Sequence, residues 1–306
     1  MRVLVVANPR ATSITANQRR VLVEALGRTA RVTVEDTANR GHGAALACRA
    51  MRDGVEAVVA LGGDGTINEV VNGVLTDGVH DGVPGVGVVP AGSTNVFARA
   101  LGLPNDPIES TAILLDALVS GRRRRISLGR ADDRWFLFAA GLGYDAAVVA
   151  AVERARAKGR RSTHTLYVRT AVREFARHLR ESPAIAVEHT DGMVRAGMHF
   201  AVVSNVSPWT FLGNRALTVN PYASFDTGLS LYGRLRMGPV SMIRGLADLL
   251  ATDRVPGGRA VLIEDDLAEL TLTATPAQPF QVDGDYLGER ERVRFRNAPR
   301  ALAIIA

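Results

Sequence analysis

Four consecutive residues, Gly62, Gly63, Asp64 and Gly65, are the most promising place for chemistry in this sequence of 306 residues. They follow an apolar run that ends at Leu61 and precede a segment with helical spacing, so we expect them at a helix N-terminus. Backbone amides and the positive end of the helix dipole make such a terminus an anion site, and glycines let a phosphate approach the main chain closely. An ordinary strand-to-helix turn, for which glycine is the usual residue, is the alternative interpretation.

Asp64 is the unexpected member of this loop, because a carboxylate repels phosphate groups. Its presence indicates either a Mg²⁺ ion that bridges it to the phosphates or a role in orienting other groups. Thr66, followed three residues later by Glu69, predicts a capping box at the start of the helix. The loop is therefore expected to hold a nucleotide together with a metal ion.

The same design recurs later in the chain. The stretch GVGVVPAGSTNVFARAL at 85–101 predicts a strand, then Gly92, then Ser93 and Thr94 as hydroxyl caps of a short helix. Asn8 lies just past the first predicted strand. Because ligands of parallel sheets bind outside the carboxyl ends of the strands, we expect these loops to share one nucleotide site. The P-loop pattern G-x-x-x-x-G-K-[ST] is absent from the sequence.

The loops must be positioned by the elements around them, and these predict a parallel α/β domain. Val-rich runs predict strands at 2–8, 31–36, 56–63 and 85–92, and helical patterns lie near 17–27, 43–52, 66–76 and 107–120. Apolar strands that alternate with helices indicate a sheet covered on both faces. After the basic run at 121–125 the pattern changes. Strand patterns then predominate, with helices only near 145–157, 164–180 and 238–251, which predicts a mainly antiparallel β-sandwich.

The composition is that of a globular chain with anionic partners. The sequence has 47% hydrophobic residues and a formal net charge of +6, which favours nucleotides, nucleic acid or acidic membrane surfaces. Cys48 is the only cysteine, so we expect no internal disulfide and a reducing, cytoplasmic environment. Residues 1–8 are too short an apolar run for a signal peptide, and no stretch is apolar enough over about 20 residues to span a bilayer.

Four motifs together resemble one known family. They are GGDGTINEVVNG at 62–73, PAGSTNVFARALGLP at 90–104, GLGYDA at 141–146 and FQVDGDYLGE at 280–289. In this order they resemble the diacylglycerol-kinase-like lipid kinases, which include bacterial diacylglycerol kinases and sphingosine and ceramide kinases. The resemblance covers nearly the whole chain. It implies transfer of the γ-phosphoryl group of ATP, delivered with Mg²⁺, to the hydroxyl of diacylglycerol or a sphingoid-type lipid.

The resemblance also implies the fold and the domains. The implied fold is that of the NAD kinases and diacylglycerol kinases. It has a nucleotide-binding catalytic domain at 1–125 and a β-sandwich lipid-substrate domain at 126–297. The last strand, at 298–306, is expected to return to the first domain.

Site residues follow from the resemblance by position. Asp283 would be the general base on the acceptor hydroxyl and Asp64 a second catalytic residue, while Asp145 and Asp285 would support them. The residues that would contact ATP are Asn8, Thr37, Gly62, Gly63, Asp64, Gly65, Thr66, Asn68, Glu69, Gly92, Ser93, Thr94 and Asn95. The Asp283-Gly284 pair between two strand patterns is also a strong hairpin signal, and the two interpretations are compatible.

The sequence departs from the family pattern at three places. The first loop usually reads asparagine, proline, any residue, serine and glycine, whereas this chain has Arg10, Ala11 and Thr12 after Asn8 and Pro9. Bacterial diacylglycerol kinases often carry aspartates where this chain has Val96 and Thr227, and both positions belong to the network around a structural magnesium in those relatives. We therefore expect Mg²⁺ with ATP, while a structural magnesium site is doubtful.

Other functions remain open at this point. An NAD kinase is the closest alternative, since that family shares a GGDG loop and a similar two-domain plan, although GSTNVFAR and VDGD fit lipid kinases better. The G-x-G-x-x-A pattern at 141–146 has the form of a dinucleotide fingerprint, so a nicotinamide-dependent oxidoreductase is a remote alternative. The six histidines show no ligand spacing, and no zinc site is expected.

Two basic clusters indicate a possible membrane partner. The first is Arg122 to Arg125, and the second follows the helix near 145–157 and comprises Arg154, Arg156, Lys158, Arg160 and Arg161. Either could face anionic lipid headgroups at the inner face of the membrane, although solvated arginine-rich faces are common. No nucleic-acid reader module is recognisable, so no nucleic acid is expected. The apolar segment 207–213 could line a lipid cleft or pack in the core, and a homodimer is left open.

Overall fold

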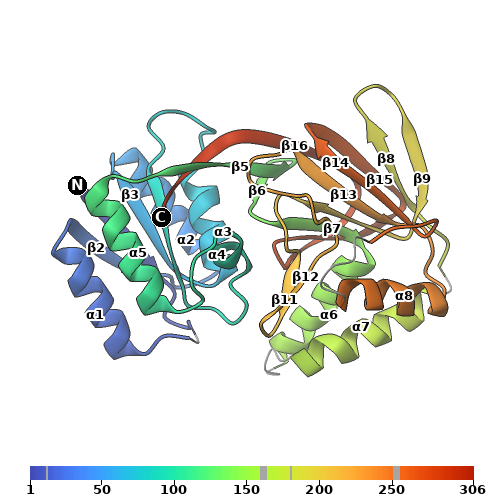
Figure 1. The fold of residues 1–306 in the computed structure, drawn as a ribbon, viewed down its shortest axis with the longest axis horizontal. Helices are drawn as coiled ribbons and strands as arrows, with labels where there is room; N and C mark the ends of the chain where they lie inside the picture. Colours follow the sequence, from blue (N-terminus) through green and yellow to red (C-terminus); the bar gives the residue numbers. More distant parts are fainter. Residues whose placement is uncertain (12, 159–163, 180, 251–255) are drawn as a thin grey trace. The chain divides into compact units, whose positions relative to one another are not determined.

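The computed structural model describes residues 1–11, 13–158, 164–179, 181–250 and 256–306 (Figure 1). The chain divides into two compact units. Unit 1 comprises Met1–Leu128 and Pro299–Ala306, and unit 2 comprises Gly129–Ala298.

Unit 1 contains a parallel sheet. Its strands are β1 (Arg2–Ala7), β2 (Arg31–Asp36), β3 (Ala57–Gly62), β4 (Gly85–Pro90) and the end of β16 (Asp285–Ile305), in the order β16-β4-β3-β1-β2. All these pairings are parallel, including that of Ile304 with Val86. Every residue of β3 and β4 is buried, as expected for a parallel sheet that is covered on both faces.

Helices cover the two faces of this sheet. The helices of unit 1 are α1 (Ala16–Gly27), α2 (His42–Arg52), α3 (Asp64–Val74), α4 (Val96–Ala100) and α5 (Pro107–Ser120). α1 and α5 pack together on one face, and α2 and α3 pack together on the other (Figure 1). α1 begins with a capping box between Thr15 and Gln18, and the side chain of Asp106 accepts hydrogen bonds from two amides at the start of α5.

Unit 2 is built from antiparallel strands. Its main path runs β14 (Val261–Leu267), β13 (Leu229–Arg234), β10 (Phe200–Ser204), β7 (Ala139–Gly143), β15 (Glu269–Val282) and β16. The long strand β15 is central, because its first half pairs with β8 (Ile185–His189) and its last residues pair with β7. The remaining strands are β9 (Val194–Met198) beside β8, the last residues of β5 (Arg124–Ala131) beside β6 (Arg134–Phe136), and the separate hairpin β11 (Thr210–Leu212) and β12 (Arg215–Leu217).

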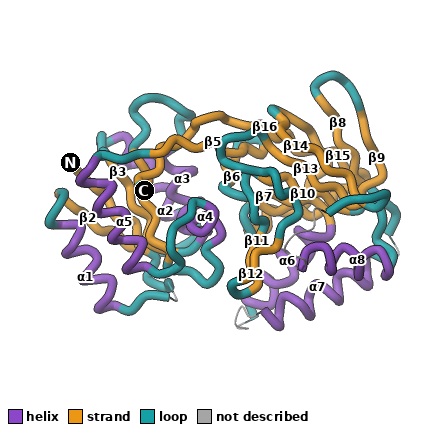
Figure 2. The backbone as a smooth tube through the Cα atoms, in the orientation of Figure 1, coloured by secondary structure: helices purple, strands orange, loops and turns teal. Residues whose placement is uncertain are grey.

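Three helices complete unit 2 and lie on one side of its sheet (Figures 1 and 2). They are α6 (Tyr144–Ala157), α7 (His164–His178) and α8 (Pro239–Leu250). α6 contacts β7, β10 and β15 and also packs against α7. The core of the unit is formed by buried side chains from both halves of β15, together with residues such as Phe136, Leu231 and Phe295.

The fold class predicted from the sequence is confirmed, with an α/β unit followed by an antiparallel β-rich unit. Some details of the prediction were wrong. The basic run at 121–125 does more than separate the two patterns of secondary structure, because strand β5 begins within it, at Arg124. The sequence also predicts separate strands at 268–274, 278–284 and 134–140, whereas Glu269–Val282 form the single strand β15 and the stretch 134–140 is divided between β6 and β7.

The dinucleotide-fingerprint interpretation of 141–146 is also wrong. A dinucleotide fold requires a parallel βαβ unit, whereas β7 pairs antiparallel with both of its neighbours, β10 and β15. The glycines serve local packing. A Cβ atom on Gly141 would lie 2.2 Å from the Oδ2 atom of Asp145, and Gly143 has φ +92° with the carbonyl of His199 nearby.

Candidate functional site

Close contacts require glycine at Gly62, Gly63 and Gly92 in the loops that follow β3 and β4. A Cβ atom on Gly92 would lie 2.6 Å from the Cα atom of Gly63, and one on Gly62 would lie 2.4 Å from Oγ1 of Thr66. The amide of Ala91 donates to the carbonyl of Gly62 at 2.8 Å. Gly65 differs from the other three, because it is exposed and a Cβ atom there would meet nothing within 4 Å. Packing therefore explains why Gly62, Gly63 and Gly92 are glycines, whereas no packing contact explains the glycine at position 65.

The predicted capping box at the start of α3 is wrong. The helix begins at Asp64 with Gly63 as its N-cap, and no side chain caps its first amides. Thr66 lies within the first turn. The carboxylate of Glu69 reaches to the neighbouring helix, where it accepts hydrogen bonds from the amides of Gly41 at 2.7 Å and Gly43 at 2.9 Å. The uncapped terminus with the exposed Gly65 is thus open to an anion.

Asp64 caps a different helix. Its Oδ2 accepts from the amide of Val96 at 2.9 Å, and its Oδ1 accepts from the amide of Phe97 at 3.0 Å. Burial of the carboxyl group raises the pKa of Asp64 above its ordinary value, and the two backbone hydrogen bonds act in the opposite direction. Of the two roles that the sequence left open for this carboxylate, the contacts favour the orientation of other groups, because both oxygens hold the start of α4.

Ser93 and Thr94 are not the caps of α4 that the sequence predicts. The N-cap is Asn95, in the left-handed region with φ +51°, and it makes no side-chain cap. Its side chain instead closes the loop, accepting from the amide of Gly92 and donating to the carbonyl of Gly92, each at 2.9 Å. Ser93 is exposed beside this turn.

The remaining candidates of unit 1 lie at the same edge of the sheet. The amide of Asn8 donates to the carbonyl of Leu61 at 2.9 Å, and the side-chain amide of Asn8 is 3.4 Å from Oγ1 of Thr66. Thr37 follows β2 in the same way, donating its amide to Ala7. Asn68 is buried inside α3, where its Oδ1 accepts from Asn72. Thr12 of the first loop lies outside the described residues.

Asp283 occupies the predicted hairpin turn. Val282 pairs with Asp285, and the two turn residues Asp283 and Gly284 have φ values of +49° and +81°, as a type I′ turn requires. The carboxylate is buried and accepts three backbone hydrogen bonds, at 2.7 Å from Leu137, 3.0 Å from Phe138 and 3.2 Å from Ala139. These amides fix the orientation of the carboxylate and tie the turn to the segment before β7.

A second buried carboxylate lies beside this turn. Asp145, at the first turn of α6, accepts a hydrogen bond of 2.9 Å from Nε2 of Gln281, and Oε1 of Gln281 accepts from the amide of Gly284 at 2.8 Å. Burial raises the pKa of Asp145 to about 6, against a smaller lowering effect of the hydrogen bond from Gln281. Gln281 was missed as a candidate from the sequence, although it lies two residues before Asp283 in the same motif.

Two further candidate positions are Asp285, in the same hairpin, and Thr227, one of the two positions related to the structural magnesium. Both side chains have partners within the protein. Asp285 forms an ion pair with Arg134 at 3.5 Å. The hydroxyl of Thr227 donates to the carbonyl of Ser224 at 3.1 Å, within the loop before β13. Within the described part of the chain, no three side chains of the types His, Cys, Asp or Glu form a group that could hold a metal ion.

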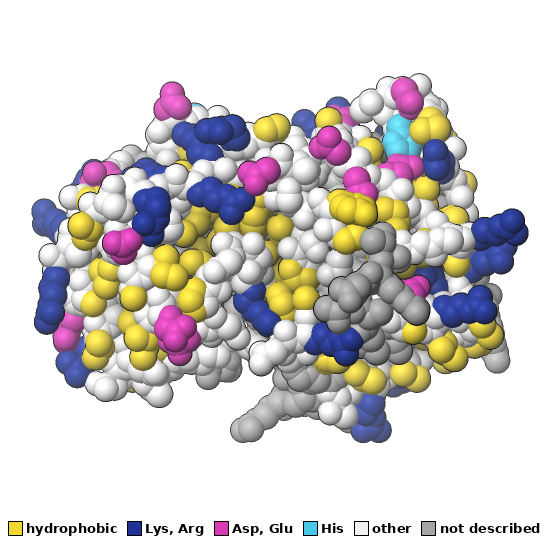
Figure 3. Space-filling model, in the orientation of Figure 1, with side chains coloured by type: hydrophobic (Ala, Val, Ile, Leu, Met, Phe, Trp, Pro, Cys, Tyr) yellow, Lys and Arg dark blue, Asp and Glu magenta, His cyan; other side chains and the backbone are white. Residues whose placement is uncertain are grey.

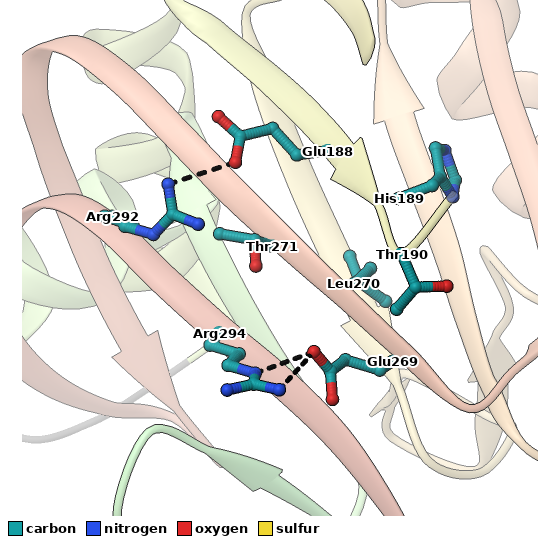
Figure 4. A pocket seen from close by; sticks show the side chains of 8 residues that line it. All are labelled: Glu188, His189, Thr190, Glu269, Leu270, Thr271, Arg292 and Arg294. Carbon is teal, nitrogen blue, oxygen red and sulfur yellow. Dashed lines mark hydrogen bonds and ion pairs between the residues drawn. The ribbon is translucent and has the colours of Figure 1, made fainter. Parts of the chain in front are cut away.

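A surface hollow of unit 2 contains none of the predicted site residues (Figure 4). Two ion pairs cross it, between Arg292 and Glu188 at 3.0 Å and between Arg294 and Glu269 at 2.6 Å. Because its arginines already have carboxylate partners, the hollow is not a candidate site for an anionic substrate.

The first basic cluster holds the end of the chain. Arg122 forms an ion pair with Asp116 and donates to the carbonyl of Ala306 at 2.8 Å, and Arg125 donates to the carbonyl of Arg300 at 3.4 Å. In the second cluster, Arg154, Arg156 and Lys158 are exposed, whereas Arg160 and Arg161 lie outside the described residues. The segment at 207–213 forms part of the β11–β12 hairpin, and Trp209 is half-buried there.

Comparison with known proteins gives a consistent result. Residues 2–131 match the family model of the diacylglycerol kinase catalytic domain. The diacylglycerol kinase of Bacillus subtilis (strain 168) is 45% identical over 86 residues, and that of Staphylococcus aureus (strain JH9) is 38% identical over 89 residues. These matches cover 28% and 29% of this chain, and each spans only 26% of the relative's own length.

Solved structures extend the likeness of fold to the whole chain. The crystal structure of a diacylglycerol kinase from Bacillus anthracis str. Sterne has a TM-score of 0.74 at 16% identity, over 99% of this chain and 96% of that one. An NAD kinase from Archaeoglobus fulgidus, solved in complex with ATP, has a TM-score of 0.53 at 14% identity, over 100% and 94%. At these identities the likeness concerns the fold alone.

The family match and the structural site coincide in sequence, because residues 2–131 contain the glycine loop, the Asn95 loop and the strands that position them. The resemblance found in the sequence motifs is therefore confirmed: residues 2–131 are similar to the diacylglycerol kinase catalytic domain, and the fold of the whole chain is similar to that of a diacylglycerol kinase structure.

Proposed function

We propose that this protein is a lipid kinase that transfers the γ-phosphoryl group of ATP to the hydroxyl of diacylglycerol or a sphingoid-type lipid. The observation that carries the proposal is the match of residues 2–131 to the diacylglycerol kinase catalytic domain, which includes the loops that meet at Gly63 and Gly92. The names of the curated relatives support the same activity.

Unit 1 has features that suit a bound nucleotide. The first amides of α3 have no side-chain cap, and Gly65 beside them is exposed with open space above its Cα atom. An uncapped helix terminus of this kind favours phosphate groups. The phosphates would therefore lie against Gly63 to Gly65, with Ser93 and Asn8 on the neighbouring loops. Mg²⁺ that arrives with ATP would neutralise charge on the phosphates.

Proton acceptance is assigned to Asp283 in unit 2. As the lipid hydroxyl attacks the γ-phosphorus and the bond to ADP breaks, the hydroxyl proton needs an acceptor, and a carboxylate can serve. The three amides that bind Asp283 support this role by holding the carboxylate in one orientation. Asp145 and Asp285 would support the turn that carries it. We place the enzyme in the cytoplasm, in peripheral contact with the inner face of the membrane.

The activity is tested by incubating the purified protein with γ-labelled ATP and Mg²⁺ and a panel that holds diacylglycerol, a sphingoid base, a ceramide and NAD. Label in a lipid is the expected result. Because the fold is also similar to an NAD kinase, NAD belongs in the panel, and label found only in NADP would overturn the lipid assignment.

The role of Asp283 is tested by Asp283→Asn. General-base catalysis typically contributes about 10²- to 10⁴-fold, so kcat should fall by about that factor while the KM for ATP changes little. The asparagine also loses part of the amide cradle, because its NH₂ group cannot accept hydrogen bonds. Asn205→Ala is the matched control, since Asn205 holds the same segment through the carbonyl of Leu137 but leaves the carboxylate in place. Equal loss of kcat in both variants would assign Asp283 a structural role only.

A further inference from the structure

The outer faces of α7 and α8 carry exposed hydrophobic side chains that the fold of unit 2 does not bury. On α7, Val168 is 54% exposed, Val172 64% and Leu179, just past the helix, 41%. On α8, Val240 is 64% exposed and Ile243 69%. The spacing of 168 to 172 and of 240 to 243 places each pair on one side of its helix. We call these five residues the apolar row.

A basic row runs beside the apolar row on α7. Arg169, Arg173 and Arg177 follow one another at intervals of four residues, so they form a second line on the same outer surface. Arg169 and Arg173 have no ion pair with any described residue. Glu174, the only acidic residue of α7, is 5% exposed and points inward. Arg244 of α8 is also exposed.

The inward face of α7 is already fixed by specific contacts. The ring of Tyr144 on α6 contacts Phe175 and His178, with centroids 6.5 Å and 5.5 Å apart, and its hydroxyl donates to the carbonyl of Ala171 at 2.9 Å. α8 is held by the buried Arg234, which donates to Ser241 at its first turn. The inward side of each helix is therefore already packed, and the apolar and basic rows lie outside the core of unit 2.

Hydrophobic and basic side chains lie next to one another over the region of α7 and α8 (Figure 3). Exposed apolar residues flanked by arginines on one helix face are the pattern of helices that lie in a membrane interface. The arginine heads can reach phosphate groups while the apolar side chains enter the boundary with the acyl chains. Acidic residues on the outer face of α7 would repel anionic headgroups, and the single acidic residue of this helix, Glu174, is buried.

We propose that the apolar and basic rows of α7 and α8 form a docking surface for a bilayer that contains anionic phospholipids. The proposal rests on the lipid-kinase function for its biological purpose, because a kinase of membrane lipids must reach a substrate held in a bilayer. It names a different surface from the basic run at 122–125, whose Arg122 and Arg125 bind the C-terminal segment.

The experiment measures binding to vesicles of phosphatidylglycerol and phosphatidylcholine, and to vesicles of phosphatidylcholine alone, by co-sedimentation. Each basic residue near an anionic surface contributes about fivefold in binding, so Arg169→Gln/Arg173→Gln should bind roughly 30-fold more weakly to the anionic vesicles. Val172→Ser/Ile243→Ser should lower binding by about tenfold or more through lost apolar burial, and its residual binding should remain sensitive to salt.

Matched controls come from unit 1. Arg28→Gln/Arg31→Gln removes the same charge from another exposed surface, and Val119→Ser changes a side chain that is 73% exposed on α5. Both controls should bind like the wild type. Equal binding by the α7 variants and the wild type, or equal losses in the two arginine variants, would overturn the proposal. A change in oligomeric mass without a change in vesicle binding would also overturn it, since a second copy of the chain would then cover the surface.

Phosphorylation assays separate this proposal from the proposed function. On a dispersed short-chain diacylglycerol the α7 variants should work at the wild-type rate, whereas on vesicle-embedded substrate they should lose activity in proportion to binding. If the wild type phosphorylates no lipid but the binding pattern holds, the kinase assignment fails and the docking surface stands.

Discussion

Two carboxylates, the half-buried Asp64 and the buried Asp145, have different tasks that follow from their partners. Asp64 accepts two backbone amides and so substitutes for a helix cap. Asp145 has one side-chain donor, Gln281, so little offsets its burial and its pKa rises to about 6. Each therefore supports a direct prediction on stability.

Asp64→Asn should destabilise the fold as well as reduce turnover. The NH₂ group of asparagine would face the amide of Val96 or Phe97, which leaves a donor without its acceptor and costs about 1–3 kcal/mol. Urea unfolding should show a lower midpoint than for the wild type, whereas Asp81→Asn, at an exposed position, should change nothing. Equal midpoints for both variants would mean that the carboxylate does not act as a cap.

Asp145→Asn should stabilise the protein at neutral pH. The carboxyl of Asp145 has a folded-state pKa of about 6, above its ordinary value of 3.8, so the folded state binds the proton more tightly than the unfolded state. Stability is then highest below pH 3.8 and decreases as pH rises to about 6, by about 3 kcal/mol in all. The asparagine has no charge to bury and can still accept from Gln281.

The measurement is the difference in Tm between Asp145→Asn and the wild type at several pH values. The difference should grow in favour of the variant from pH 4 to pH 7 and stay level above that. A constant difference over this range would show that Asp145 titrates normally in the folded protein.

At the scale of elements, the loop after β3 and the loop after β4 act as one structure. They touch through the backbones of Gly63 and Gly92, and Asn95 closes the second loop on itself. Asp64 then connects the first loop to α4. Because backbone atoms meet directly, these loops cannot be separated without breaking the site that both would form.

Gly92→Ala and Gly65→Ala should behave in opposite ways. A Cβ atom at Gly92 would meet backbone at 2.6 Å, so this variant should lose about 1–3 kcal/mol or more. The Cβ atom at Gly65 meets nothing within 4 Å inside a helix, so Gly65→Ala should be as stable as the wild type or more stable by up to about 1 kcal/mol. If phosphates lie there, the KM for ATP should nevertheless rise in Gly65→Ala.

Thermal unfolding and ATP titration of the two variants check this pair. An unchanged KM for ATP in a stable Gly65→Ala protein would move the phosphates away from this helix terminus. A fully stable Gly92→Ala protein would show that the two loops are not in contact.

At the scale of the whole molecule, the end of the chain completes the first unit. Ile304 and Ile305 pair in parallel with β4 and are almost fully buried, although β16 begins in the other unit. Arg122 and Arg125 bind the same C-terminal segment. The stability of unit 1 therefore depends on residues that follow unit 2 in the sequence. No helix in the described ranges is long and apolar enough to cross a bilayer.

Ile305→Ala should weaken unit 1. Truncation of a buried isoleucine typically costs about 2–5 kcal/mol, and Ile305 belongs to the core cluster that also contains Val3, Val59 and Leu114. Denaturant unfolding should show this loss, while Val119→Ala on the exposed side of α5 should have little effect. Hydrogen exchange of β4 amides should rise in Ile305→Ala, and protection equal to that of the wild type would show that the terminal strand is dispensable.

Much of this architecture could be predicted because its causes are local. Strands such as β3 are continuous apolar runs, the helix at Pro107–Ser120 has its start signal in Asp106 and Pro107, and the Asp283-Gly284 pair specifies its own turn. Predictions failed where a local signal competed with a distant partner. Thr66 and Glu69 fit a capping box, but Glu69 instead binds the amides of Gly41 and Gly43 on another helix.

The sequence by itself determined the order of strands and helices along the chain, the two kinds of sheet, the glycine loops and the resemblance to diacylglycerol kinases, because periodicity, turn residues and motifs are written in neighbouring positions. Only the tertiary structure decided the partners of the carboxylates and the surface of α7 and α8. Asp64 with Val96, Asp283 with Leu137 and Asp145 with Gln281 are joined across 32, 146 and 136 positions. Such contacts, like the burial that raises the pKa of Asp145 and the exposure of Val172, exist only once the chain has folded.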